Sequence, residues 1–301
     1  MNLILGYWVV VLIWSTTPMG MVISNESVSF MSAAGLRLLM ALTLLLFIAA
    51  VRRKSLVPHP DAIKMYLIAA AGICPQMSLV YWSAQYVPSG VMSIVFALSP
   101  CFTYLASLFL LPESTTLSVR KIVSLMIAVF GMALIFIDQL NLSFQAAMGI
   151  LALLASSVCF AVSTVLLKRY SDNVNLDPLS QTTGTLLFTL PLFLLCWWFF
   201  DGVVPKNITI RSLTAISYLA FLGTVVGFSL YFWVFQRMNV VTVSLITMIS
   251  PLFAITLGTV FLNEQFTVRI TIGGVLVLLS LLYFEGITLK YLVRFWRDKF
   301  S

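Results

Sequence analysis

Arg37 is the only lysine or arginine that lies well inside an apolar run of this sequence. If such a run crosses a membrane, a full charge within it is costly unless it is paired or hydrated. One interpretation is that Arg37 binds a carboxylate or another anionic group of a substrate. The other is that it reaches toward the membrane surface, where it bonds to backbone carbonyls and to Glu26 in a nearby predicted loop.

Hydroxyl, amide and aromatic side chains also cluster on a few of the apolar runs. In hydrocarbon such groups need partners, so they are expected to point into a helix bundle. They could line a substrate cavity, or they could pack helices together and anchor them at the membrane surface. The candidate cavity residues are Trp14, Ser15, Thr17, Arg37, Gln76, Tyr81, Ser157, Thr164, Tyr231 and Thr247.

Pro100 and Pro251 are predicted to lie near the middle of two membrane helices. A proline there removes one backbone hydrogen bond and crowds the carbonyl four residues earlier, which frees the carbonyls of Phe96 and Thr247. Irregular backbone survives in a membrane only where protein or a water-filled cavity satisfies it. We therefore predict that both prolines line a central cavity and act as hinges. Ordinary kinks satisfied by neighbouring helices are the alternative.

Glu113 and Glu264 each follow the end of a predicted helix, and a threonine follows each of them after three residues. This position favours a structural cap, in which the carboxylate accepts hydrogen bonds from the first backbone N–H groups of the next helix. A role in gating is the alternative.

Several kinds of chemistry lack the residues they need. No predicted helix has an Asp or Glu at its middle; Glu285, near a helix end, comes closest, and the only histidine, His59, lies in a predicted loop. Coupling to protons through a buried titrating group therefore has no obvious residue. The sequence has no His-Glu-x-x-His motif, no aspartyl pair and no histidine to activate a serine, which argues against an enzyme. No metal site and no cofactor is predicted, and the four cysteines are interpreted as packing residues.

Long apolar segments must position these residues. The chain of 301 residues is 61% hydrophobic and 9% charged, whereas soluble proteins carry about 25% charged residues. It is therefore predicted to be an all-α polytopic membrane protein, not a nucleic-acid-binding one, despite its net charge of +7. The ten predicted membrane helices are 3–22, 32–51, 65–86, 90–111, 121–137, 147–167, 179–200, 213–235, 240–262 and 271–291.

Lysines and arginines are distributed unequally between the two sets of predicted loops. With the N-terminus in the cytoplasm, cytoplasmic loops and the tail hold 13 of the 17, and the opposite side holds 3. Positive residues accumulate on the cytoplasmic side, which predicts that both termini lie there. The expected location is the inner (plasma) membrane of a bacterium.

Two long segments, 78–116 and 229–267, match each other at an offset of 151 residues. Eleven of their 39 ungapped positions are identical, where about three are expected by chance. Five predicted helices separate each element from its copy, and an odd number makes the copies run in opposite directions. The sequence thus predicts two inverted five-helix repeats, an arrangement typical of secondary transporters.

The sequence resembles the EamA family of the drug/metabolite transporter superfamily over nearly its whole length. The residues that carry the resemblance are Trp14-Ser15-Thr16, Arg37-Leu38, Pro100 through Glu113, Gly223-Thr224, Pro251, Leu262-Asn263-Glu264 and Gly273-Gly274. The resemblance implies two five-helix units, at 3–138 and 147–291. The lysines and arginines that follow predict a basic cytoplasmic tail at 292–301. It does not identify a substrate. The residue before the helix-four glutamate, usually glycine in the family, is Pro112 here and Asn263 in the second copy.

The predicted function is transport of a small metabolite by alternating access, with export of an amino acid or similar zwitterion favoured. A carrier of sugars or phosphorylated metabolites would need several basic residues in its cavity, and only Arg37 is present. Cationic drugs, held by aromatic walls, are another substrate class. A channel and an intramembrane enzyme are the alternatives that are not transporters. The expected partners are the substrate and the lipid bilayer; a monomer suffices, and a dimer is compatible with the sequence.

Overall fold

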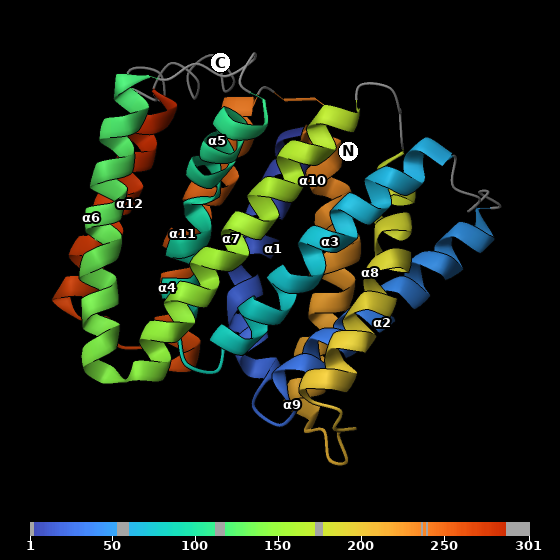
Figure 1. Cartoon of the computed structure of the whole chain (residues 1–301). Helices are drawn as coiled ribbons and strands as arrows, with labels where there is room; N and C mark the ends of the chain where they lie inside the picture. The colour runs from blue at the N-terminus through green and yellow to red at the C-terminus, as the bar shows by residue number, and fades with distance from the viewer. Residues whose placement is uncertain are drawn as a thin grey trace.

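The computed structural model describes residues 3–52, 60–111, 118–171, 177–235, 237–238 and 240–286, and these residues are almost entirely helical (Figure 1). The first repeat contains α1 (Leu3–Ser24), α2 (Phe30–Val51), α3 (Pro60–Ser83), α4 (Ser89–Ala97), α5 (Ser99–Leu110) and α6 (Val119–Leu142). The second contains α7 (Phe144–Ser171), α8 (Pro178–Phe200), α9 (Ile210–Tyr218), the π-helix η1 (Leu219–Val226), α10 (Gly227–Phe235), α11 (Val240–Leu262) and α12 (Val268–Glu285).

The described helices have the length and composition of membrane spans. Nine of them, counting α4–α5 and α9–η1–α10 as single spans, are long and apolar enough to cross a bilayer. The tenth is α11, which has 23 residues and includes the apolar stretch Ile249–Leu262. Large apolar side chains such as Phe109, Phe130 and Phe199 are exposed on the outside of the bundle, as a lipid-facing surface requires. The all-α membrane fold is confirmed.

The chain crosses the bundle an even number of times, so Leu3 and Glu285 lie at the same end (Figure 1, top). We call this end the proximal face and the opposite end the distal face. Leu111 follows α5 at the proximal face, whereas its repeat counterpart Leu262 ends α11 at the distal face. The two copies of the matching segment therefore run in opposite directions, which confirms the inverted repeats.

The two repeats pack closely where α6 crosses α12. A Cβ atom on Gly131 would lie 2.7 Å from the carbonyl oxygen of Gly273, and one on Gly273 would lie 2.6 Å from that of Gly131. The absence of side chains at both positions lets the two backbones touch, which is how membrane helices gain packing energy without a hydrophobic driving force.

The end of α6 differs from the sequence prediction. The helix continues to Leu142, five residues past the predicted end, and only Ser143 separates it from α7. Asp138 is therefore helical and buried, with 7% of its surface exposed, and its Oδ1 accepts a 2.8 Å hydrogen bond from Thr267 Oγ1. Gln139 is likewise buried, at 1%. The sequence predicts a loop at this polar pair, but the two residues are helical and buried, so the expectation that Glu285 is the acidic residue nearest to a helix interior was wrong.

The last helix also begins earlier than expected, at Val268, and it closes at Gly286. Gly286 has a φ of 70°, the left-handed conformation that glycine adopts readily at a helix C-terminus. The remainder of the predicted helix and the basic tail lie outside the described residues.

Candidate functional site

Arg37 lies on α2, seven residues after its first residue, or about 10 Å along the helix axis. Its side chain is 2% exposed. Nε donates to Thr224 Oγ1 on η1 at 3.0 Å, and Nη1 donates to the hydroxyl of Tyr81 on α3 at 3.4 Å. One guanidinium thus joins three helices that belong to both repeats.

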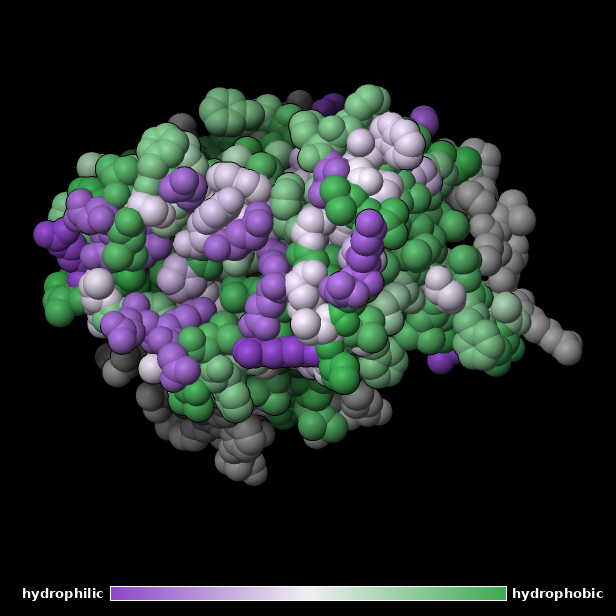
Figure 2. Space-filling view, turned by 90° about the horizontal axis from the view of Figure 1, so that it is seen from below, coloured by the Kyte–Doolittle hydropathy of each residue, from purple (hydrophilic) through white to green (hydrophobic). Residues whose placement is uncertain are grey.

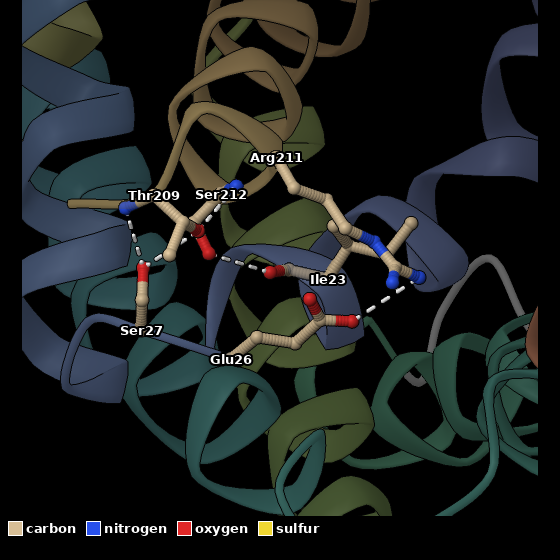
Figure 3. Close-up of polar contacts among 6 residues, drawn as sticks. All are labelled: Ile23, Glu26, Ser27, Thr209, Arg211 and Ser212. Carbon is tan, nitrogen blue, oxygen red and sulfur yellow. Dashed lines mark hydrogen bonds and ion pairs between the residues drawn. The ribbon is translucent and has the colours of Figure 1, made fainter.

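The structure does not pair Arg37 with Glu26. Glu26 Oε1 instead lies 3.3 Å from Nη2 of Arg211, at the distal face (Figure 3). The interpretation of Arg37 as a surface-seeking partner of Glu26 was therefore wrong. Within the part of the chain that the structure describes, no carboxylate forms an ion pair with Arg37. A guanidinium carries five N–H donors, so this buried cation keeps donors that an anion could use.

The π-helix η1 contacts Arg37 through two of its residues. Thr224 Oγ1 donates to the carbonyl of Leu219, five residues earlier, at 3.0 Å while it accepts the bond from Arg37. Gly223 lies beside the guanidinium. A Cβ atom built on Gly223 would lie 3.4 Å from Arg37 Nη2. Single π-turns occur often at functional sites. Neither residue was among the predicted cavity residues, although Gly223-Thr224 helped to carry the family resemblance and could have indicated them.

An aromatic pair lies further along the same span. The rings of Trp14 on α1 and Tyr231 on α10 are stacked, with centroids 4.7 Å apart and an interplanar angle of 30°. A Cβ on Gly227 would lie 3.7 Å from Trp14 Nε1. Gly223 and Gly227 are four residues apart, or about 6 Å along a helix. Arg37 and Trp14 therefore border neighbouring turns of one span, and Tyr231 lies one turn beyond Gly227.

Other predicted cavity residues bond within their own helices. The hydroxyls of Ser15, Thr17, Ser157 and Thr164 donate to carbonyls four residues earlier, those of Val11, Ile13, Leu153 and Phe160. These bonds satisfy the hydroxyls without a partner from another helix. The structure does not bring them to Arg37. Gln76 on α3 and Thr247 on α11 are half-buried, and their roles stay predictions.

Pro100 and Pro251 occupy unequal surroundings. The span that holds Pro100 is interrupted at Leu98, and the carbonyl of Phe96, which Pro100 was expected to free, accepts a 2.6 Å bond from Ser99 Oγ. Pro251 lies inside the continuous helix α11. The serine before it, Ser250, donates to the carbonyl of Ile246 at 2.8 Å. The hinge role of both prolines stays a prediction.

Glu264 caps a helix, but not the one that follows it in the chain. Its Oε1 accepts from Ser89 N at 2.7 Å and its Oε2 from Gly90 N at 3.2 Å, so it caps α4 of the other repeat. The following helix, α12, is capped by Thr267, whose hydroxyl accepts from Ile270 N. The matching residue Glu113 lies outside the described residues.

Further polar contacts join the repeats at the distal face. Ser27 Oγ accepts bonds of 3.1 Å from both the N and Oγ1 of Thr209, and Ser212 Oγ donates to the carbonyl of Ile23 at 3.0 Å (Figure 3). These contacts connect the α1–α2 turn to the start of α9. Figure 2 shows this face, where hydrophilic residues gather at the left and centre and hydrophobic residues surround much of the rim.

The sequence profile of the EamA-like transporter family matches residues 2–137 and 147–284, one match for each repeat. The chain belongs to the EamA-like transporter family. It is an integral membrane protein, and the recognition made from its motifs is confirmed. The exact limits of the two units stay predictions.

Named relatives are similar to the chain over most of its length. The uncharacterized transporter YoaV of Bacillus subtilis is 26% identical over 92% of this chain and 94% of its own. Protein PagO of Salmonella typhimurium is 28% identical, over 83% and 82% respectively. A probable amino-acid metabolite efflux pump of Escherichia coli is 24% identical over 65% of this chain and 67% of its own. A solved crystal structure that covers 93% of this chain and 94% of its own, at 18% identity, has a TM-score of 0.64, which shows the shared fold.

Proposed function

We propose that this protein exports an amino acid or a similar zwitterionic metabolite by alternating access. Membership of a transporter family supports the general activity. The observation that carries the substrate class is Arg37: a buried cation, without an acidic partner among the described residues, beside the stacked pair Trp14 and Tyr231. A relative named as a probable amino-acid metabolite efflux pump agrees with this substrate class.

In this proposal the substrate carboxylate binds the guanidinium of Arg37. Arginine and carboxylate form paired, charge-assisted hydrogen bonds, which are stronger than bonds to neutral hydroxyls. The carboxylate would therefore bind the guanidinium donors that Thr224 and Tyr81 do not use. The rings of Trp14 and Tyr231 would receive the ammonium group or an apolar side chain, since aromatic faces attract cations.

The same residues disfavour the other substrate classes. A phosphoryl group carries about two negative charges at neutral pH and is usually held by several basic residues, and Arg37 is the only basic residue in this cluster. A cationic drug would meet the positive charge of Arg37 in a medium of low dielectric constant, where like charges repel strongly. A zwitterion offers one group for the cation and another for the rings.

The excess of lysines and arginines supports cytoplasmic termini, so the distal face would look outward from a bacterial inner membrane. The substrate and the lipid bilayer are the proposed partners, and one chain holds both repeats, so a monomer suffices. The cycle involves no chemical step and no cofactor.

A thermal-shift screen of purified protein against amino acids, sugar phosphates and cationic drugs tests the substrate class. We expect stabilisation by one or more amino acids, and Arg37→Gln should weaken binding about tenfold or more, because hydrogen bonds to charged groups contribute about 1.5–3 kcal/mol. Arg211→Gln is the matched control, since that side chain is 59% exposed and should leave affinity unchanged. Binding of sugar phosphates alone, or unchanged binding by the Arg37 variant, would reject the proposal.

A further inference from the structure

We propose that Glu264 is a gating residue of the transport cycle. Its carboxylate fastens the end of α11 to the start of α4 at the distal face, and this latch must open before that face can open. The proposal rests on the alternating-access part of the proposed function, and it does not depend on which substrate is carried.

Glu264 supplies a cap that α4 does not make for itself. Pro88, the residue at the N-cap position, makes no side-chain capping bond. The carboxylate instead bonds the first two backbone N–H groups of the helix, those of Ser89 and Gly90, at 2.7 and 3.2 Å. A negative charge at a helix N-terminus is favoured both by these donors and by the helix dipole. The contact is therefore among the stronger polar contacts that a half-buried side chain can form.

The local chain is shaped to deliver this carboxylate. Asn263 adopts a φ of 53°, the left-handed conformation that asparagine tolerates better than most residues. The turn lets Glu264 N donate to the carbonyl of Gly258 at 3.1 Å, which folds the side chain back along α11. A Cβ on Gly258 would collide with Glu264 Oε2 and lie 2.9 Å from Ser89 Oγ. Gly258 thus leaves the space that the carboxylate occupies.

The latch differs from the other helix caps because it joins the two repeats. The N-termini of α2, α8, α9 and α12 are capped by the residues directly before them, Ser29, Asp177, Thr209 and Thr267. Inverted repeats move against each other when access alternates, so a bond between repeats at one face has to break as that face opens. A cap made by a neighbouring residue of the same helix carries no such requirement.

The closed latch is also suited to open. Ser89 Oγ is buried in this contact without a hydrogen-bond partner among the described residues. A buried, unpartnered hydroxyl is unfavourable, and hydration on opening would relieve it. The buried Ser89 hydroxyl thus partly offsets the stabilisation by the carboxylate contact. This keeps the closed and open states of the distal face close in free energy.

Labelling of a cysteine beneath the latch tests the proposal. Ser93 is buried on α4 one turn below Ser89 and donates to its carbonyl at 3.1 Å, so Ser93→Cys is a small change. The Ser93→Cys protein is placed in lipid nanodiscs without substrate, and its labelling by a water-soluble maleimide is measured. The protein with Ser93 unchanged gives the background labelling. We expect slow labelling of Ser93→Cys alone and labelling about tenfold faster after Glu264→Gln is added, because the charge-assisted bonds are lost.

Two further variants attack the same contact differently. Gly258→Ala should displace the carboxylate sterically while leaving it charged. Ser89→Pro removes the N–H donor, and proline is tolerated at the first position of a helix; Pro88 has a ψ of 144°, which suits a residue that precedes proline. Each should accelerate labelling as Glu264→Gln does. Agreement among variants that differ in charge, volume and backbone excludes a folding defect peculiar to one of them.

Glu26→Gln is the control, because it also breaks a contact between the repeats at the distal face but an exposed one. When Glu26→Gln is combined with Ser93→Cys, the labelling rate should stay within about twofold of that of Ser93→Cys alone, since exposed ion pairs contribute little. Unchanged labelling in variants that remain folded by thermal melting would overturn the latch. Because the assay contains no substrate, that outcome leaves the proposed substrate class untouched, and failure of amino-acid binding leaves the latch untouched.

Discussion

Ser99-Pro100 in the first repeat and Ser250-Pro251 in the second are identical pairs at matching positions, yet their surroundings differ. Around Pro100 the span breaks into α4 and α5, and the serine bonds a carbonyl three residues back. Around Pro251 the helix is continuous, and the serine bonds a carbonyl four residues back. The same local sequence therefore adopts two shapes, so the difference is set by what each copy packs against.

The third span of each repeat shows the reverse difference. In the first repeat this span is the continuous helix α3, whereas in the second it contains the π-helix η1. Gly72 and Gly223 are counterparts at the offset of 151, but Gly72 packs against Ser163 and Gly223 lies beside Arg37. Two similar halves held in different shapes are what one end state of an alternating carrier requires, because the other state would exchange those shapes.

The two glycines offer the largest effect. Gly72→Ala should lower the free energy of unfolding by about 2 kcal/mol, because the new methyl group would collide with Ser163 and overpacking costs about 1–3 kcal/mol. Gly223→Ala should change stability by less than about 1 kcal/mol, since its methyl group would meet neighbours at 3.4 Å or more. Thermal melting of the purified variants measures both. Equal losses would mean that the two glycines are structurally equivalent.

The prolines should act in opposite directions if the repeats exchange shapes. Pro100→Ala restores an N–H group and favours a continuous first-repeat helix, so it should destabilise the present state and speed labelling of Ser93→Cys about fivefold. Pro251→Ala should disfavour a break in the second repeat and slow that labelling by a similar factor. Labelling rates in nanodiscs provide the measurement. Changes of the same sign would contradict exchange of shape between the repeats.

A smaller effect is expected from removing a hydroxyl that forms a hydrogen bond to a different helix. Thr224→Val removes the acceptor for Arg37 Nε and should weaken substrate binding about fivefold, the effect of about 1 kcal/mol. Thr164→Val removes a hydroxyl that bonds the carbonyl of Phe160 in its own helix, and it should change affinity by less than about twofold. Titration calorimetry with the amino acid found in the screen compares them, and equal losses would remove the special role of Thr224.

The smallest effect belongs to the exposed pair at the distal face. Glu26→Gln should change the free energy of unfolding by less than about 0.5 kcal/mol, because Glu26 and Arg211 are 38% and 59% exposed and solvent screens their attraction. Thermal melting at low and high salt measures this. A loss above about 1 kcal/mol would show that this contact, and not Glu264 alone, holds the distal face together.

Much of the fold follows from the sequence because hydrocarbon solvent imposes simple rules. Spans need long apolar runs, and the repeat fixes their opposite directions, so the membrane helices and the inverted symmetry were predicted correctly. The end of α6 was not, because Asp138 and Gln139 look like loop residues until their burial against other helices is known. Polar residues mark helix ends only where water reaches them.

The candidate site was predicted in part. Arg37, Tyr81, Trp14 and Tyr231 were recognised from their types and depth, and the structure places the first two in contact and stacks the other two. Thr224 was missed because no local pattern predicts a π-helix, although the Gly223-Thr224 motif of the family resemblance could have indicated it. The helix that Glu264 caps was also missed, since contacts between distant repeats depend on tertiary packing and not on neighbours in the chain.

Exchange transport in proteoliposomes tests the central claim most directly. Vesicles are loaded with the amino acid found in the screen, and uptake of the same labelled compound is measured. The account predicts saturable uptake that is faster when substrate is present inside the vesicles. The corresponding amino-acid amide should not compete with this uptake. Arg37→Gln should abolish it, and Arg211→Gln should preserve it. Uptake that rises linearly with concentration, ignores internal substrate and survives Arg37→Gln would contradict it.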